Sequence, residues 1–424
     1  MKLMVIGGGG REHAIIRKLK ENPAVEVLYA LPGNAGMREA IPVPEIGAKD
    51  IPAQVAFALS HGVDYAVVAP DDPLALGAVD ALTAAGIPCF GPDARAAVIE
   101  SSKAFAKDLM RKYGIPTARY ETFSDPESAC AYLENCALPI VVKADGLALG
   151  KGVVIATTRE AARAAVRSLM EDRVFGASGD RVVIEEFLTG PEVSVLCFTD
   201  GVTVKPMVSS MDHKRAGDGD TGPNTGGMGA VAPNPYYTPA IAETCRETIF
   251  LPTVRAMAAE GRPFRGCLYF GLMLTPDGPK VIEYNCRFGD PETQVVLPLL
   301  ESDLLTAMQA CTAGTLAETE VRFSPRSACC VVLASNGYPG KYETGFPITV
   351  DDGFTGRLYC AGVKRNDDNV PVTAGGRVLG VTDVGDTLRQ AIDKAYEQAA
   401  KVHFENAYCR KDIGQRALAA GEEK

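Results

Sequence analysis

Residues 281–292, with the sequence VIEYNCRFGDPE, contain two possible metal ligands on one expected strand. Glu283 and Asn285 stand two positions apart, so in a strand their side chains point to the same face. A carboxylate and an amide oxygen are hard ligands, which suit a magnesium ion that also bridges phosphates. Arg287 and Asp290 follow at once. An edge strand with ordinary polar side chains is the alternative interpretation.

A second stretch, KADGLALGKGV, places two lysines beside a glycine-rich loop. Lys143 ends a β-branched strand and Lys151 lies in the loop, where glycines let the backbone approach a polyphosphate and lysines neutralise its charge. Gly152 follows Lys151, so neither the P-loop pattern G-x-x-x-x-G-K-[ST] nor a kinase loop fits. A solvated hairpin tip is the alternative here.

The amino-terminal sequence GGGGREHA follows an apolar strand and opens a helix. Backbone N–H groups at such a turn, together with the helix N-terminus, favour an anion. Gly7 and Gly9 fit the start of a dinucleotide-binding motif, but Glu12 stands where that motif needs a small residue. This argues against an NAD-dependent oxidoreductase. A phosphate or ribose site is preferred over a plain tight turn.

Residues 212–227 combine many glycines and charged side chains with no aliphatic side chain larger than that of Ala216. His213 stands between Asp212 and Lys214, and we interpret it as part of a substrate loop, although a lone histidine is more often structural. The glycines predict a segment that is free to close over a ligand.

The elements that must position these residues follow from the pattern of apolar residues. Strands alternate with helices up to about residue 100, which predicts a parallel α/β domain. A helix over 102–113 leads into a small α+β unit, and LYFGLMLT and KVIEYN form a hairpin around a Pro-Asp-Gly turn. The segment from about Arg322 is expected to be a separate small domain.

Composition excludes several classes of protein. The net charge of −10 argues against a broad nucleic-acid or anionic-membrane surface. No apolar run approaches membrane-spanning length. The twelve cysteines include no C-x-x-C pair, and Cys329 and Cys330 lie in an apolar run, so buried thiols in a reducing compartment are expected. We expect a cytoplasmic protein, either monomeric or dimeric.

These stretches, with SSKAFAKDLM, RFGDPETQ, GGRVLGVT and YCRKDIGQRA, resemble in order the phosphoribosylamine–glycine ligase family of the ATP-grasp superfamily. The resemblance implies an α/β and α+β multidomain architecture. It has an amino-terminal parallel α/β domain (1–101), an ATP-grasp domain (102–320) with a lid subdomain (about 118–188), and a small carboxy-terminal α+β domain (321–424). It also implies the ATP-dependent joining of glycine to 5-phosphoribosylamine through glycyl phosphate, with Mg²⁺ or Mn²⁺, in de novo purine biosynthesis.

The resemblance assigns roles to individual residues, with Glu283 and Asn285 as metal ligands. The nucleotide would be bound by Lys103, Lys143, Gly150, Lys151, Gly152, Glu185, Phe187, Leu188 and Glu192. The substrates would be bound by Gly9, Gly10, Arg11, Asn224, Thr225, Gly226, Gly227, Met228, Arg287, Asp290 and Pro291. Catalytic roles fall to Lys143, Asp212, His213, Lys214 and Arg287. The sequence departs from the family pattern at Ala69, Asp71, Leu149 and Cys360.

Two other functions stay open from the sequence. One is a different carboxylate–amine ligase or carboxylase of the same superfamily in purine synthesis. The other is a non-catalytic nucleotide-binding regulator, against which the presence of Lys143, Glu283 and Asn285 argues. A requirement of ADP release for both glycine and phosphoribosylamine would separate them.

Overall fold

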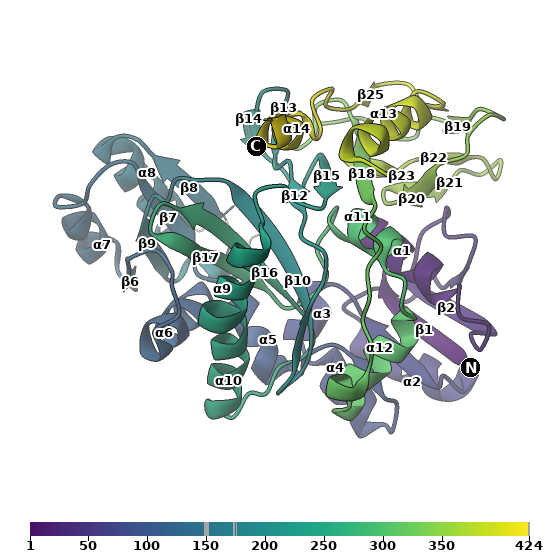
Figure 1. The fold of residues 1–424 in the computed structure, drawn as a ribbon, viewed down its shortest axis with the longest axis horizontal. Helices are drawn as coiled ribbons and strands as arrows, with labels where there is room; N and C mark the ends of the chain where they lie inside the picture. The colour runs from purple at the N-terminus through teal and green to yellow at the C-terminus, as the bar shows by residue number, and fades with distance from the viewer. Residues whose placement is uncertain (148–151, 173, 175, 423–424) are drawn as a thin grey trace.

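The computed structural model describes residues 1–147, 152–172, 174 and 176–422. Its strands form four larger sheets, which belong to an amino-terminal part, a central part, a small unit at one end and a carboxy-terminal part (Figure 1). Within the described residues, no helix is both long and apolar enough to cross a membrane.

The amino-terminal part is a parallel sheet with the strand order β3-β2-β1-β4-β5. The apolar run Leu3–Ile6 of the central strand is fully buried, as expected for a strand covered on both faces. This confirms the predicted parallel α/β domain. Its strands are β1 (Lys2–Gly7), β2 (Val27–Pro32), β3 (Ile41–Pro42), β4 (Tyr65–Val68) and β5 (Cys89–Phe90). Its helices are α1 (Gly10–Leu19), α2 (Ile51–His61), α3 (Asp71–Ala75), α4 (Ala78–Ala84) and α5 (Ala94–Ser101).

The central part is an antiparallel sheet with the order β11-β10-β16-β17. The predicted hairpin is β16–β17, and its register places Glu283 opposite Gly271 and Asn285 opposite Tyr269. The strands are β10 (Glu192–Asp200), β11 (Val204–Pro206), β16 (Arg265–Thr275) and β17 (Gly278–Asn285). The helices are α6 (Lys103–Tyr113), α9 (Pro239–Cys245), the π-helix η2 (Arg246–Phe250), α10 (Leu251–Ala259), α11 (Thr293–Val296) and α12 (Leu304–Ala313), with the 3₁₀ turns η3 (Leu297–Leu299) and η4 (Leu316–Glu318).

A small unit lies at the opposite end of the molecule from the chain's amino terminus (Figure 1). Its sheet has the order β6-β9-β7-β8, and a separate apolar core that includes Val142, Val166 and Ile184 lies between the sheet and its helices. The elements are β6 (Tyr120–Phe123), α7 (Pro126–Leu133), β7 (Ile140–Ala144), β8 (Val153–Ala156), α8 (Arg159–Met170), the 3₁₀ turn η1 (Gly176–Gly179) and β9 (Val182–Glu186).

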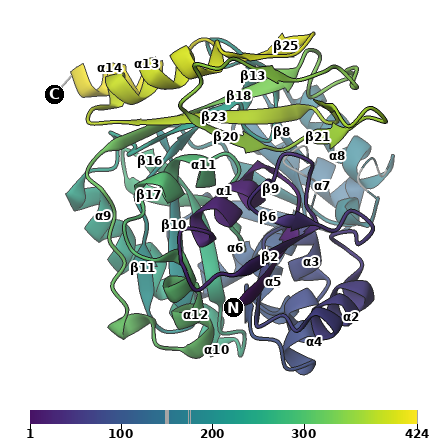
Figure 2. The same cartoon turned by 90° about the vertical axis from the view of Figure 1, so that its right-hand side faces the viewer.

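The carboxy-terminal sheet extends across one side of the molecule above the amino-terminal part (Figure 2). Its order is β12-β15-β18-β23-β20, with β25 also paired to β18. The strands are β12 (Met211–Asp212), β15 (Gly229–Ala232), β18 (Ser327–Ser335), β20 (Arg357–Cys360), β23 (Arg377–Gly385) and β25 (Ala407–Tyr408). Helices α13 (Leu388–Ala399) and α14 (Gln415–Glu422) accompany it, as do the strand pairs β13 (Arg215–Gly217) with β14 (Thr221–Asn224), β19 (Thr349–Val350) with β24 (Val402–His403), and β21 (Val363–Arg365) with β22 (Pro371–Thr373).

This sheet takes strands from two distant parts of the sequence. β12 and β15 come from the middle of the chain, and β15 pairs with β18 from Gly229 opposite Val331 to Ala232 opposite Ala328. The division of the chain at residue 320 stays a prediction. Cys329 and Cys330 are buried in β18, and all twelve cysteines are free thiols.

The carboxy-terminal part also contacts the amino-terminal part directly. The backbone N–H of Cys360 donates to Nδ1 of His13 at 2.8 Å, and Nδ2 of Asn34 donates to the carbonyl oxygen of Cys360 at 2.8 Å. Nε2 of His13 lies 3.1 Å from Oε2 of Glu39. These contacts join α1 and the loop after β2 to the end of β20.

Candidate active site

A cavity of about 770 Å³ lies where the four parts meet. Arg11 reaches it from α1, Lys103 from α6, Glu283 from β17 and Arg377 from β23. Most of the residues singled out from the sequence line this one space. They are Arg11, Lys103, Lys143, Gly152, Glu185, Phe187, Leu188, Glu192, Asp212, Lys214, Asn224, Thr225, Gly226, Glu283, Asn285, Arg287 and Asp290.

Two lysines and one glutamate form a buried charged group on the side of the small unit. Nζ of Lys143, at the end of β7, and Nζ of Lys107, on α6, both form ion pairs with the carboxylate of Glu185 on β9. Burial alone would raise the pKa of Glu185, but the two lysines outweigh it and lower the pKa. Burial lowers the pKa of Lys107 to about 8.

Lys107 is a site residue that the sequence reasoning missed. It follows Lys103 by four positions, so the two lie on the same face of α6. That spacing could have indicated from the sequence that Lys107 lies near the same site as Lys103. Gly150 and Lys151, which were expected to contact phosphates, lie outside the described residues.

The expected metal ligands both reach the cavity from β17. Oε1 of Glu283 is 3.7 Å from Nζ of Lys214, and Oδ1 of Asn285 accepts a hydrogen bond from Nη2 of Arg287 at 3.2 Å. Burial alone would raise the pKa of Glu283, but Lys214 and Lys143 outweigh it and keep the carboxyl group ionised.

The donor set fits magnesium. Over the described ranges, no three histidine, cysteine, aspartate or glutamate side chains gather into a group that could hold a metal ion. Mg²⁺ is commonly held by one or two protein oxygens, completed by water and phosphate oxygens, and does not need such a cage. Glu283 and Asn285 are therefore suitable protein ligands.

An ion pair with Glu100 fixes Arg287 next to the expected metal ligands. Nη2 of Arg287 lies 3.3 Å from Oε1 of Glu100, and Oε2 of Glu100 accepts from the backbone N–H of Cys286 at 2.7 Å. Burial alone would lower the pKa of Arg287, but Glu100 and Asp71 raise it above its ordinary value. Asp71, where the sequence departs from the family pattern, lines the same cavity at the start of α3.

Glu12 explains why the amino-terminal loop departs from a dinucleotide motif. Its carboxylate accepts from the backbone N–H of Gly9 at 2.6 Å and from Nε of Arg11 at 2.7 Å. Gly7 has φ +121°, and a Cβ there would lie 2.5 Å from Cγ of Glu12, so only glycine fits. The loop therefore binds its own glutamate and presents Arg11 to the cavity. Gly9 and Gly10, which were expected to bind substrate, are not among the residues that line the cavity.

Three residues of the carboxy-terminal part, Tyr338, Arg377 and Arg416, also line the cavity and were missed. The hydroxyl of Tyr338 accepts from the backbone N–H of Gly226 at 3.0 Å, and Nη1 of Arg377 donates to the carbonyl oxygen of Gly226 at 2.8 Å. The same Nη1 donates to the carbonyl oxygen of Asp290 at 2.8 Å. Arg377 lies within the GGRVLGVT motif, which carried no residue assignment.

The structure places His213, which was expected to be catalytic, outside the cavity lining. The side chain is 1% exposed and does not line the cavity. Nδ1 lies 3.2 Å from the carbonyl oxygen of Gly229, and Nε2 accepts from the backbone N–H of Gly414 at 3.1 Å. Both ring nitrogens thus contact backbone groups, and through them His213 joins the 211–232 segment to the carboxy-terminal part.

Three expected substrate residues also lie outside the cavity lining. Met228 is fully buried in the apolar core of the carboxy-terminal sheet. Gly227 has φ +114°, and a Cβ there would lie 2.3 Å from Cδ of Pro291 and 2.7 Å from Oδ1 of Asp212. Gly227 and Pro291 therefore pack against each other and support Asp212, which does line the cavity.

The burial of His213 predicts a particular dependence of stability on pH. Burial, with the charges of Arg410 and Arg416, lowers the pKa of His213 to about 4. The unfolded chain, with a pKa of about 6.5, binds more protons between these values, so stability falls as pH falls from about 6.5 to about 4, by about 3 kcal/mol. The variant His213→Asn is expected to lose this part of the slope in urea unfolding measured at a series of pH values.

The control for this measurement is His403→Asn, because His403 is exposed and pairs with Asp351 at the surface. It is expected to leave the slope near that of the wild type. An equal slope in wild type and His213→Asn would contradict the buried neutral histidine.

Comparisons with known proteins agree with this architecture. Family models match the chain in three consecutive parts: the phosphoribosylglycinamide synthetase N domain over residues 1–100, its ATP-grasp (A) domain over 101–293 and its C domain over 328–416. The phosphoribosylamine–glycine ligase of Vibrio cholerae is 47% identical over the full length of both chains, and that of Escherichia coli is 48% identical over 99% of each.

Solved structures show the same relationship. The crystal structure of phosphoribosylamine–glycine ligase from Thermotoga maritima superposes with a TM-score of 0.86 at 36% identity, covering 97% of this chain and 100% of that one. The biotin carboxylase domain of 2-oxoglutarate carboxylase from Hydrogenobacter thermophilus shares the fold, with a TM-score of 0.76 at 17% identity over 96% of this chain and 91% of that one.

Fold and site together define an ATP-dependent ligase of the ATP-grasp class. Within that class, the chain belongs to the phosphoribosylamine–glycine ligase family. Its activity is the glycinamide ribonucleotide synthetase step of purine biosynthesis, as the resemblance implied.

Proposed function

We propose that this cavity binds ATP with Mg²⁺, or Mn²⁺, and uses it to join glycine to 5-phosphoribosylamine through glycyl phosphate. The observation that carries the proposal is the convergence of Lys103, Lys143, Glu283 and Asn285 in one cavity. The first two supply positive charge for phosphates, and the last two supply oxygen ligands.

The nucleotide would lie between the small unit and the central sheet. Residues 185–188 comprise the last two residues of β9 and the two that follow it, and Glu192 begins β10. Both stretches border the cavity where an adenine and a ribose would fit. The Hydrogenobacter thermophilus domain of the same fold was solved with ADP and magnesium. That likeness supports a nucleotide site with a divalent ion in this cleft.

Attack of the glycine carboxylate on the γ-phosphate brings anions together, and the cavity reduces that cost. An oxygen of the glycine carboxylate forms a bond to phosphorus as the bond to ADP breaks. Lys103 and Lys143 stabilise the charge on the phosphoryl oxygens. The bound metal ion would neutralise further charge on the phosphates. The amine of phosphoribosylamine then attacks the glycyl carbonyl, phosphate leaves, and the nitrogen loses a proton.

The ammonium group of glycine needs a negative partner, and two carboxylates offer one. Asp212 and Glu292 both line the cavity, and the hydroxyl of Ser194 donates to Oε1 of Glu292 at 3.3 Å. Burial, and then the charge of Glu292, raises the pKa of Asp212 well above its usual value. A cation placed between the two carboxylates would remove this repulsion. We assign the amine end of glycine to this corner of the cavity.

The experiment is to measure ADP release with each substrate omitted in turn. We expect release only with glycine, phosphoribosylamine and Mg²⁺ together, and glycinamide ribonucleotide formed in equal amount. ADP release that needs bicarbonate and not glycine would favour a carboxylase. Nucleotide binding without any turnover would favour a regulator.

A further inference from the structure

The hairpin of β13 and β14 needs support from outside itself. In the part of the chain that the structure describes, it forms a two-stranded sheet with no third strand beside it. Such a hairpin is only marginally stable in water. Arg215, Asp220 and Asn224 of this hairpin nevertheless line the cavity. Their positions must therefore be fixed by contacts with another part of the chain.

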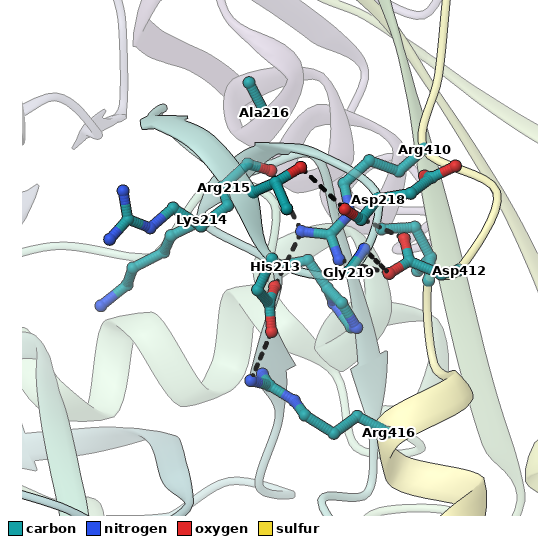
Figure 3. A network of polar contacts seen from close by, with 12 residues as sticks. His213, Lys214, Arg215, Ala216, Asp218, Gly219, Arg410, Asp412 and Arg416 are labelled. Atoms are coloured by element: carbon teal, nitrogen blue, oxygen red, sulfur yellow. Dashed lines mark hydrogen bonds and ion pairs between the residues drawn. The ribbon is translucent and has the colours of Figure 1, made fainter.

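Arg410 supplies the main contacts. Its side chain is 1% exposed. Nε and Nη2 donate to the two carboxylate oxygens of Asp412 at 2.8 and 2.7 Å, and Nη1 donates to the carbonyl oxygen of Arg215 at 3.1 Å and to Oδ1 of Asp220 at 2.9 Å. One buried guanidinium group therefore holds both the first strand and the turn of the hairpin (Figure 3).

Neighbours of Arg410 bind the same hairpin. Figure 3 shows Arg410, Asp412 and Arg416 facing the hairpin from the carboxy-terminal segment. Nη1 of Arg416 lies 2.7 Å from Oδ2 of Asp220. Three further hydrogen bonds of 2.8 Å run from Gly219 N to Asp412 Oδ2, from Lys411 N to Asp218 Oδ1 and from the Tyr408 hydroxyl to the carbonyl oxygen of Ala216.

We infer that Arg410 is a positioning residue of the ligase, and that residues 408–416 form the support that sets the hairpin against the cavity. Arg410 itself does not line the cavity and acts through Arg215 and Asp220. The inference rests on the proposed function, in which the residues of 212–226 that line the cavity bind substrate. Because its side-chain contacts go to the hairpin and to Asp412, Arg410 governs the use of glycine and phosphoribosylamine and not the affinity for ATP.

The test compares Arg410→Met and Arg410→Lys with wild type in steady-state kinetics and amide hydrogen exchange. We expect Arg410→Met to lower kcat/KM for phosphoribosylamine by about a hundredfold, because a displacement of about 1 Å at a positioned group has effects of that size. The KM for ATP should stay unchanged, and exchange should rise at residues 215–224. Arg410→Lys keeps the charge but not the fork of donors, so it should restore only part of the activity.

Two milder variants keep the test decisive if Arg410→Met does not fold. Asp412→Asn and Tyr408→Phe each remove part of the support, and neither residue lines the cavity. Both should shift kcat/KM and hairpin exchange in the same direction by smaller amounts.

The matched control is Gln398→Met. Gln398 is a buried polar residue of the same part of the molecule whose Oε1 accepts from the backbone N–H groups of Thr355 and Gly356. It should lose thermal stability while keeping wild-type kinetics.

Either of two results would overturn the inference. One is that Asp412→Asn, and an Arg410 variant that folds, both show wild-type kinetics and wild-type hydrogen exchange. The other is a loss of activity that comes with a changed affinity for ATP and with faster hydrogen exchange throughout the chain, as in a general loss of stability. Failure of the proposed function would appear differently, as ADP release by the wild-type enzyme without glycine or phosphoribosylamine.

Discussion

Replacement of Glu283 by glutamine is expected to lower the turnover of the ligase by about a hundredfold or more. The change replaces the carboxylate ligand on β17 by a neutral amide and removes the negative charge that interacts with Lys214 and Lys143. The fold should survive, because Glu283 is partly solvent-accessible at the wall of the cavity and glutamine has the same shape. Turnover should be measured as glycinamide ribonucleotide formed at increasing Mg²⁺, and the half-saturating Mg²⁺ concentration should rise.

Asp277→Asn is the matched control for this variant. Asp277 lies in the turn of the same β16–β17 hairpin, is exposed, and pairs only loosely with Lys280 at 3.7 Å. It should change neither turnover nor the Mg²⁺ dependence. Wild-type turnover and unchanged Mg²⁺ saturation in Glu283→Gln would remove Glu283 from the metal site.

The second large effect is expected at Lys143. Lys143→Ala should lower turnover by about a hundredfold, because charge that develops on the transferred phosphoryl group loses its partner. The variant should still fold, because Glu185 keeps its ion pair with Lys107 when Lys143 is replaced. Lys143→Arg should restore only part of the activity, because a planar guanidinium does not replace a compact ammonium at a buried position. Steady-state kinetics with ATP varied would show the loss.

Lys280→Ala serves as the control, since Lys280 lies on β17 beside Glu186 but outside the cavity lining. Its kinetics should match those of wild type. Full activity in Lys143→Arg would show that the site does not demand a lysine. A Lys143→Ala enzyme that had lost its fold would show that the buried group of charges is structural.

Local patterns in the sequence were enough to place much of the fold. The alternation of apolar strands and helices to residue 100 became the parallel sheet, and the Pro-Asp-Gly turn marked the β16–β17 hairpin. These features depend on neighbours in sequence. Period-2 and period-3.6 patterns report such neighbours well. The pairing of β15 with β18, almost a hundred residues away, has no local signature.

The same distinction between local and distant features applies to the residues of the site. Glu283 and Asn285 share a face of one strand, which their spacing already indicates. Arg377 and Tyr338 enter the cavity from a different part of the chain, and nothing in their own surroundings in sequence shows where they lie. His213 lies outside the cavity lining although its neighbours Asp212 and Lys214 belong to it, because the chain leaves β12 at Asp212 and the side chain of His213 turns to a buried position.

The strands contributed by residues 211–232 limit how this ligase can be recombined with its relatives. β15 covers one edge of β18 and carries β12 on its outer side. A chimera that joined the first 320 residues of one homologue to the last hundred of another would therefore combine strands from two proteins in a single sheet. The side chains of β15 and β18 would then come from different homologues and would not have evolved to pack together. An isolated carboxy-terminal fragment would leave the β18 edge open to pairing with other chains. The exchangeable unit is the carboxy-terminal part together with residues 211–232, so a chimera that preserves the enzyme needs three crossovers, one on each side of that segment and one near residue 320.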